Sequence, residues 1–462
     1  MRWLFFVSIA LVGAVSLTAT AAEAMTVAVE PQSAAASETA VSAPPDGATE
    51  PKNPRFQSHA DFSFGAIGED LFLMLHAEQS FAHKGFLLQL SAPLRFRVRD
   101  NAPSDSPGLR EQDWDQASDW ARIVRMLSFQ HQRDDLRISL ELGELNGVSM
   151  GHGALIGQYF NSTDMDYYQG GLDVDVQISH LGVSFFMSNV VEPALFAGRL
   201  ETAPLAWFLD APMAQRFALG MTLFGDRGVP HRALETGRTA LVVVGFDAAF
   251  RFVDLPRAFT SVYVDWGVMD GSGGVHLGLA GTFLLSENRD IRLSAQAEYR
   301  YAGEDYYPAF VNPFYDYNRH WFSVDEGTGT HNTFAEHLAN PRMDVKNAHG
   351  LMLESRMNFG TKTNFLIRYD YLNRHRPHWL LLQLSITPTP RWFVNGFYAG
   401  QDIAGGAGTF SGEALMGLAI GQQFLGPLRW FAEWQRRFRS IATGMPAHRN
   451  EFSSGVGVVF SY

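Results

Sequence analysis

The sequence predicts an all-β fold: a closed, antiparallel transmembrane β-barrel of about 20 strands with long extracellular loops. From Phe56 onward, apolar and polar side chains alternate in segments of about ten residues, and alternation of period two indicates strands. Soluble sandwich strands average about 5 or 6 residues, whereas a tilted transmembrane strand needs about ten. The only long apolar run lies at the start of the chain, which excludes a helical membrane protein.

The first stretch of the chain, residues 1–24, has the pattern of a secretory signal peptide. Arg2 precedes an apolar run from Trp3 to Leu17, and small residues follow. Residues 25–55 are rich in Ala, Pro, Ser and Thr without periodicity, which predicts a disordered periplasmic tether. The barrel is expected to occupy residues 56–462.

The composition limits how such an exported chain is stabilised and what it binds. There is no cysteine among the 462 residues, so no disulfide staples the fold and a closed hydrogen-bond network has to replace it. The formal net charge of -12, with no basic cluster to offset it, argues against a nucleic-acid partner.

The individual strands follow from the alternation. The segment from Phe86 to Arg99 has Phe, Leu, Ala and Val on one face and three arginines on the other, and the segment from Ile291 to Tyr301 divides in the same way. A weak pair within residues 190–214 leaves 18 strands as the alternative, and either number is even, as single-chain bacterial barrels require. The strand centres are expected near residues 62, 75, 92, 126, 141, 173, 185, 197, 219, 246, 263, 280, 296, 354, 368, 383, 396, 418, 433 and 457.

The connections between these segments alternate between long and short, as expected when both termini lie in the periplasm. The short ones include Arg133 to Asp135, Asp254 to Arg257 and Pro388 to Pro390, and they are expected at the periplasmic end. The long ones are expected outside the cell, near residues 100–118, 147–165, 225–238, 302–346, 400–411 and 439–451.

The end of the chain resembles the C-terminal signal of Gram-negative outer-membrane barrels. Val456, Val458, Phe460 and Tyr462 alternate on one face, and the chain ends on an aromatic residue. The resemblance implies export through the general secretory pathway and recognition of Phe460 and Tyr462 by the barrel-assembly machinery. It also implies a location in the cell outer membrane, in contact with its lipids and with lipopolysaccharide.

Charged side chains occupy the inward face of many predicted strands, and their signs nearly balance. They either line a water-filled pathway or pair with one another to hold the wall, and strand faces alone do not separate these two interpretations. The predicted lumen-lining residues are Arg95, Arg97, Arg99, Arg137, Asp173, Asp175, Arg292, Glu298, Arg300, Arg368, Asp370, Arg429, Glu433 and Arg437.

A glycine-rich loop between two predicted strands is a candidate constriction. Apolar residues follow Gly151, His152 and Gly153 and lead to Tyr159, which suggests a loop folded inward as a constriction, with an ordinary surface loop as the equal alternative. The segment is also similar to a glycine-histidine-glycine loop of uncharacterised outer-membrane proteins, a similarity that carries no activity. His152 has no second ligand at a recognisable spacing, so neither a metal nor another cofactor is expected.

The longest loop, about residues 302–346, is rich in aromatic residues that include Tyr315 and Trp321. Aromatic rings beside carboxylates suit the stacking of sugars, and the alternative is that the loop packs against itself. No Ser-His pair appears in a recognisable catalytic context, so an enzyme is not expected.

Together these patterns predict a porin-like channel for the passive diffusion of small polar solutes. The alternative is a non-conducting barrel whose aromatic extracellular loop binds a polysaccharide or an envelope protein. The oligomeric state is left open by the sequence.

Overall fold

A computed structural model describes the chain from Arg55 to Ser461, with gaps at 102–107, 134, 228–240, 270, 304–305, 321–322, 325–330, 333–346, 361, 374–377, 390, 402–413 and 440–446. The predicted signal peptide, the tether up to residue 54, Trp321 and Tyr462 lie outside the described residues. Within the described residues, no helix is long and apolar enough to cross a membrane.

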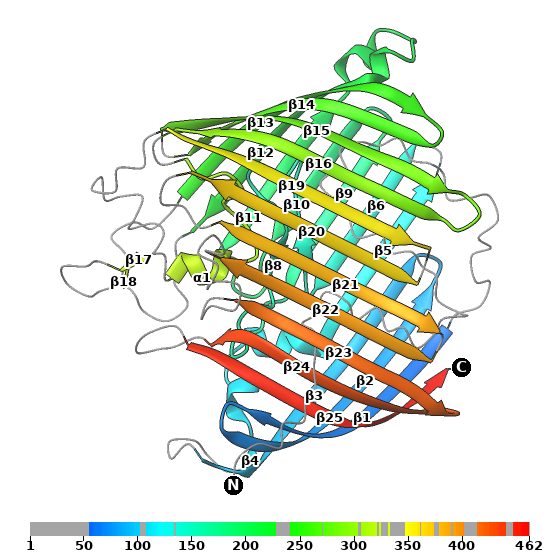
Figure 1. Cartoon of the computed structure of the whole chain (residues 1–462), viewed down its shortest axis with the longest axis vertical. Coiled ribbons are helices and arrows are strands. Elements are labelled where there is room, and N and C mark those ends of the chain that lie inside the picture. The colour runs from blue at the N-terminus through cyan, green and yellow to red at the C-terminus, as the bar shows by residue number, and fades with distance from the viewer. Residues whose placement is uncertain are drawn as a thin grey trace.

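Twenty antiparallel strands form the wall of a closed barrel (Figure 1), which confirms the predicted fold class and the larger of the two strand numbers. All the expected strand centres fall inside observed strands. In chain order the wall strands are β1 (Arg55–Ile67), β2 (Asp70–His83), β3 (Phe86–Arg99), β5 (Val124–Arg133), β6 (Leu136–Gly143), β9 (Gly171–Ile178), β10 (Leu181–Met187), β11 (Leu195–Thr202), β12 (Phe217–Asp226), β13 (Leu241–Leu255), β14 (Ala258–Met269), β15 (Ser272–Ser286), β16 (Ile291–Ala302), β19 (Ala348–Phe359), β20 (Thr363–Leu372), β21 (Trp379–Thr389), β22 (Trp392–Gln401), β23 (Leu415–Leu425), β24 (Leu428–Arg439) and β25 (Ala447–Ser461). The two-residue strand β4 (Gly108–Leu109) pairs with β3 inside this arrangement.

The first and last strands close the sheet. β1 pairs with β25 from Gln57 opposite Ser461 to Ile67 opposite Glu451. At the middle of this seam Asp61 of β1, Gly457 of β25 and Arg429 of β24 lie side by side. The Arg429 side chain reaches across the glycine, and its Nε donates to Asp61 Oδ1 over 3.1 Å. A Cβ at Gly457 would stand 1.9 Å from that oxygen, so only glycine leaves room for the ion pair.

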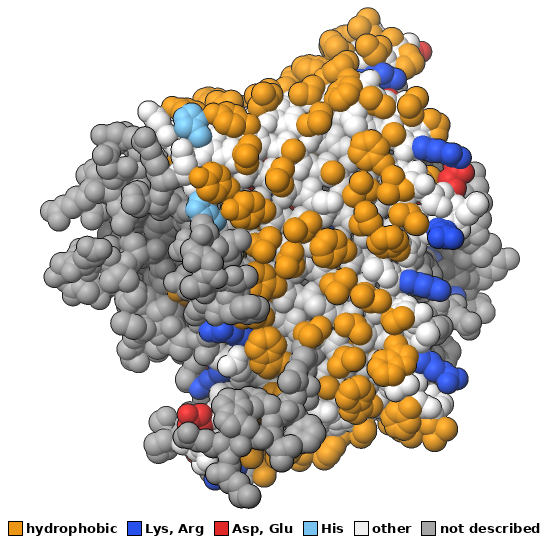
Figure 2. Space-filling view, viewed as in Figure 1, with side chains coloured by type: hydrophobic (Ala, Val, Ile, Leu, Met, Phe, Trp, Pro, Cys, Tyr) orange, Lys and Arg blue, Asp and Glu red, His pale blue; other side chains and the backbone are white. Residues whose placement is uncertain are grey.

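The outer face of the wall is apolar. Figure 2 shows hydrophobic side chains across the visible strands, with lysine and arginine gathered at the rims. Along β14 the pattern is clear, since Val262, Val264 and Trp266 are exposed while the intervening Tyr263 and Asp265 are buried. A large and continuous exposed apolar surface of this kind is what a lipid-facing barrel presents.

The long connections between wall strands lie mainly at one end of the barrel, as expected, where β1–β2 and β14–β15 are also joined by short turns. At the other end β2–β3, β5–β6, β9–β10, β13–β14 and β23–β24 are joined by short turns. The exception at this end is the connection between β11 and β12, which spans 203–216 and contains two 3-10 helices, η4 (Pro204–Trp207) and η5 (Ala214–Arg216). Both β10 and β11 are present, so the weak region adds a strand pair and the 18-strand alternative is not realised.

Two of the long connections fold into the barrel and pair with each other. The first, between β6 and β9, contains β7 (Asn146–Val148) and β8 (Tyr159–Phe160), and the second, between β16 and β19, contains helix α1 (Tyr315–His320). Ile156 and Val311 form a parallel bridge between them, with Val311 N donating to Leu155 O over 3.0 Å. In this way the backbone of each inward loop satisfies part of its hydrogen-bonding requirement.

Candidate functional site

The two inward loops share an apolar core with the inner face of the barrel wall. Tyr159, Ile156, Tyr306 and Phe310 pack in one cluster with inward-facing wall residues such as Phe224. A second cluster joins Phe160 and Phe314 to wall residues of β20 to β23. These contacts fill the lumen beside β10 to β23, so the interior at this level is a packed core on that side.

Next to this core, buried charged side chains form a row of ion pairs on the inner face of the wall from β11 to β20. We call this row the ion-pair belt. Arg199 pairs with Asp247 at 2.5 Å and with Glu201 at 3.0 Å. Farther along, Arg300 pairs with Glu298 at 2.5 Å and with Asp370 at 2.6 Å. Arg368 then contacts Glu354 at 3.1 Å and Asp370 at 3.5 Å. Buried charges are stabilised only when they are paired in this way.

The glycines of the first loop allow its backbone to lie directly on this belt. Gly151 and Gly153 have positive φ values of 57 and 81, a conformation that other residues adopt at a cost. A Cβ at Gly151 would meet Arg199 Nη1 at 2.7 Å, and one at Gly153 would meet Arg368 Nη1 at 3.3 Å; Gly157, a few residues on, lies closer to Arg368, with its Cβ 2.7 Å from Nη2. The Gly-His-Gly pattern is therefore explained by close contact with two wall arginines.

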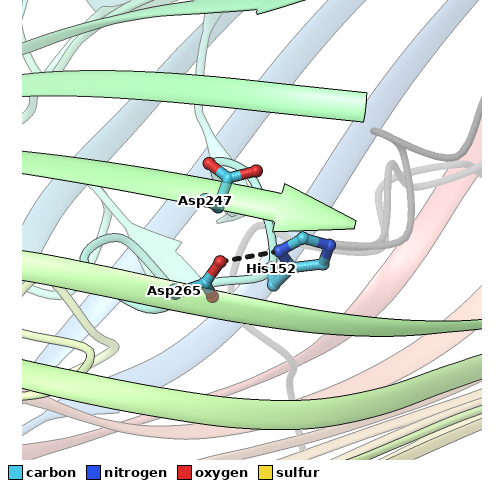
Figure 3. A group of neighbouring side chains, drawn as sticks. All are labelled: His152, Asp247 and Asp265. Carbon is cyan, nitrogen blue, oxygen red and sulfur yellow. Dashed lines mark hydrogen bonds and ion pairs between the residues drawn. The ribbon is translucent and has the colours of Figure 1, made fainter. Parts of the chain in front are cut away.

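His152 lies against the inner wall, next to Asp265 of β14 and Asp247 of β13 (Figure 3). Its Nδ1 lies 2.9 Å from Asp265 Oδ1, and its ring stacks on Tyr263 with the ring centroids 3.8 Å apart. Its carbonyl oxygen accepts a hydrogen bond of 2.8 Å from Gln296. Burial lowers the pKa of His152, but the charges of Asp265 and Asp247 outweigh burial, so the pKa lies above its ordinary value. A positively charged imidazole is thus favoured at this point of the belt.

The fold brings metal-ligating residue types to His152 that the sequence spacing did not show. Ligand atoms of His152, Asp247 and Asp265 lie within 4.8 Å of one another, and those of Asp265, His276 and Glu298 form a second such group. However, Arg199 donates to both oxygens of Asp247, and Arg300 donates to Glu298. A divalent cation would compete with these guanidiniums, so the arrangement favours internal ion pairing over metal binding.

On the opposite side of the lumen, a second network forms around Asp113. It lies in the short helix η2 (Glu111–Asp113) and is fully buried. Arg95 of β3 contacts it at 2.9 Å and Arg110 at 2.6 Å, and Arg95 also contacts Glu451 of β25 at 2.9 Å. The connection after β3 is therefore joined to the distant strand β25 through Arg95 and its two carboxylate partners.

A polar cavity of about 350 Å³ opens at the short-turn end of β5 to β14. Arg137, Arg251 and Glu201 line it together with Gln132 and Gln177. Both signs of charge are present, and the side chains are mostly half-buried. This part of the lumen is able to hold a polar solute.

The predicted lumen residues fall into three groups. Glu298, Arg300, Arg368 and Asp370 are buried within the ion-pair belt, and Arg97 is buried beside Asp70. Arg99 is exposed at the end of β3, where it donates to Asn101. The remaining residues are half-buried on inward faces: Arg95, Arg137, Asp173, Asp175, Arg292, Arg429, Glu433 and Arg437.

The other predicted site residues are placed as follows. His152 and Tyr159 are buried inside the barrel, and whether their loop limits passage stays a prediction. Tyr315 is 2% exposed and its hydroxyl donates to Asp226, so it packs inward and is not presented to the exterior. Phe460 is exposed on the outer face of β25. Its role in assembly stays a prediction.

Sequence reasoning missed several members of these networks. Arg199 and Glu201 alternate with the outward Leu200, so the strand pattern carries a signal for them. Arg110 and Asp113 lie in a connection without periodicity, and only the folded loop brings them to Arg95. No spacing rule predicts a contact of that kind.

No family model matches the chain, and no curated protein sequence matches it. Solved structures with some likeness include the outer membrane protein opdK from Pseudomonas aeruginosa, with 8% identity and a TM-score of 0.34 over 89% of this chain and 100% of that chain. Pseudomonas aeruginosa OccK2 (OpdF) in complex with glucuronate has 10% identity and a TM-score of 0.34, covering 88% and 97%. Acinetobacter baumannii OccAB4 has 9% identity and a TM-score of 0.31, covering 90% and 99%.

Likeness at this level does not define a family, so the chain's own geometry carries the interpretation. The wall is closed, antiparallel and made of an even number of strands, with an apolar exterior and a charged interior. This is the architecture of an outer-membrane-type β-barrel.

Proposed function

We propose that the protein is a porin-like channel of the Gram-negative outer membrane, through which small polar solutes diffuse passively. The observation that carries the proposal is the closed 20-strand barrel with an apolar outer face and half-buried charges on its inner face. Small barrels of about 8 strands are filled by side chains, whereas those of 16 to 18 strands leave an aqueous channel. A barrel of this size has room for both inward loops and a pathway.

The inward loops supply the selectivity in this proposal. They occupy the lumen beside β10 to β23 with apolar contacts, which directs solutes toward the rest of the inner wall, where Arg137 of β6 and Arg437 of β24 are half-buried. A narrow passage with charged walls selects by size and by charge. No covalent step is involved.

The same proposal places the chain in the cell envelope. Its apolar exterior suits contact with outer-membrane lipids and lipopolysaccharide, and the signal-peptide pattern suits export by the general secretory pathway. Phe460 at the end of the closing strand suits recognition by the barrel-assembly machinery.

Single-channel recording tests the function. Folded protein, verified by heat-modifiable gel mobility, is expected to give steady conductance steps in a planar lipid bilayer. Arg137→Gln and Arg437→Gln are expected to shift the ion selectivity toward cations, because each removes a positive charge from a half-buried lumen position. Arg95 is less suitable, because its loss would also break its ion pairs with Asp113 and Glu451 and so disturb the wall itself.

Arg257→Gln is the matched control. This arginine lies in the turn after β13, with its side chain 67% exposed and paired to Glu287, so the same charge change is made outside the lumen. Silence from folded protein would refute the channel proposal. Equal selectivity of the lumen variants and the Arg257 variant would refute the assigned lining.

The scaffold alternative is less well supported by the described residues. It required Tyr315 to act as an extracellular ligand contact, and Tyr315 is instead packed against Phe310 within the barrel. Trp321 lies outside the described residues.

A further inference from the structure

One connection at the short-turn end of the barrel is built differently from its neighbours. We call residues 203–216, between β11 and β12, the periplasmic knob. It projects from the wall at the top of Figure 1, and hydrophobic side chains cover most of its surface in Figure 2, beside an acidic and a basic side chain. A turn of two or three residues would join these antiparallel strands, so the extra length demands a physical reason.

The exposed surface of the knob is unusual for a segment in water. Phe208 is 85% exposed, and Trp207 is 56% exposed. The other large apolar side chains that it exposes are Leu205, Leu209 and Met213. Scattered exposed apolar residues are normal, but five in one short projection mark a surface that is covered by something apolar.

The knob is ordered by its own contacts. Trp207 Nε1 donates to Thr202 Oγ1 over 2.9 Å, and the indole packs edge-on against His180 in the β9–β10 turn. Backbone bonds of 3.0 Å from Ala206 N to Ala203 O and 2.9 Å from Ala214 N to Ala211 O close its two turns. These contacts fix the backbone of the knob, so its apolar side chains point away from the wall.

The wall is shortest next to the knob. β6, β9 and β11 have 8 residues each and β10 has 7, whereas β13 and β15 have 15. At about 3.3 Å per residue and a tilt of about 40°, a strand of 7 or 8 residues covers about 18 to 20 Å along the barrel axis. The apolar band of an outer-membrane barrel is about 25 Å tall. The short sector alone does not match it.

We propose that the periplasmic knob inserts into the periplasmic leaflet of the outer membrane and completes the lipid-facing surface where the strands are too short. Its apolar side chains continue the outer face from Leu200 and Leu219, which are exposed on β11 and β12. Trp207 stands at the boundary, where indole rings favour the membrane interface. Phospholipid acyl chains are the occupant. The inference rests on the proposed membrane location.

Nitroxide labelling tests this directly, because the chain has no cysteine of its own. Single cysteines are introduced as Phe208→Cys and Met213→Cys in the knob. Leu219→Cys is the lipid-facing reference, and Glu287→Cys, in the turn after β15, is the aqueous reference. The labelled proteins are folded into vesicles of phosphatidylethanolamine and phosphatidylglycerol, and collisions with oxygen and with a water-soluble nickel chelate are measured by electron paramagnetic resonance.

The proposal expects an oxygen-to-nickel collision ratio at 208 and 213 that is several-fold above the ratio at 287 and close to that at 219. Ratios at 208 and 213 equal to that at 287, with 219 still lipid-exposed, would overturn the insertion while leaving the barrel in the membrane. A water-accessible label at 219 would overturn the membrane location itself, and the insertion with it. Heat-modifiable mobility verifies folding of each variant, and conductance is not needed for any outcome.

Discussion

A single methyl group added at Gly157 is expected to push the loop between β6 and β9 away from the ion-pair belt on the inner wall. The Cβ of Gly157→Ala would lie 2.7 Å from Arg368 Nη2 and 3.0 Å from Gly153 O, whereas ordinary contacts begin at 3.4 Å. The guanidinium or the loop therefore has to move by about 0.7 Å. The tip of a long side chain usually moves at little cost, but Arg368 is fully buried between Glu354, Asp370 and the ring of Trp379.

The expected magnitude follows from the contact that is lost. Retraction of the guanidinium lengthens its 3.1 Å hydrogen bond to Glu354, and a bond to a charged group contributes about 1.5 to 3 kcal/mol. We therefore expect the free energy of unfolding to fall by about 1.5 to 3 kcal/mol. Movement of the loop into the remaining lumen is expected to change the single-channel conductance as well.

Urea titration of the folded barrel in lipid vesicles measures the first effect, and bilayer recording the second. Gly198→Ala is the matched control, because its nearest neighbour is Ser184 O at 4.0 Å and its backbone is that of an ordinary strand. A Gly157→Ala protein with the unfolding midpoint and conductance of the control would refute the close seating of the loop on Arg368.

Three further outcomes are expected. Gly457→Ala places a methyl group 1.9 Å from Asp61 Oδ1, so it should separate the seam ion pair and lower the free energy of unfolding by about 3 kcal/mol, measured by urea titration. The pKa of His152 is raised above 6.5 in the folded state, so its stabilising contribution is complete below pH 6.5 and is lost as the pH rises through the higher folded pKa. The stability difference between wild type and His152→Gln should shrink over that range, and a constant difference would contradict it. Tyr315→Phe removes the hydroxyl that donates to the Asp226 carboxylate and should cost about 1.5 to 3 kcal/mol in the same titration, whereas an unchanged midpoint would show that the contact is not stabilising.

The barrel wall was predictable from the sequence because its signal is local. A strand such as β16 displays Tyr299 and charged Arg300 on opposite faces within two residues, and strands such as β14 and β24 repeat that pattern. The lengths of the connections between strands then predicted which strand ends lie together at each end of the barrel. Even the weak pair β10 and β11 follows the alternation, although each has only 7 or 8 residues.

The interior was only partly predictable, because its contacts join distant parts of the chain. His152 and Asp265 are 113 residues apart, and Arg95 and Glu451 are separated by 356. The inward face identified many of the charged residues, but it did not show which of them are buried beneath a loop. That distinction depends on where the loops fold, and the periodicity of strands contains no information about it.

The ion pair across Gly457 also bears on how the barrel is assembled. Asp61 and Arg429 belong to strands that are not neighbours, and they meet only when β25 lies between them. In an open precursor, both groups face the interior without their partner, so closure and charge neutralisation happen in one step. The ion pair between Asp61 and Arg429 therefore stabilises the closed barrel relative to an open precursor. A slow final phase of folding in a variant that lacks this ion pair would reveal that role.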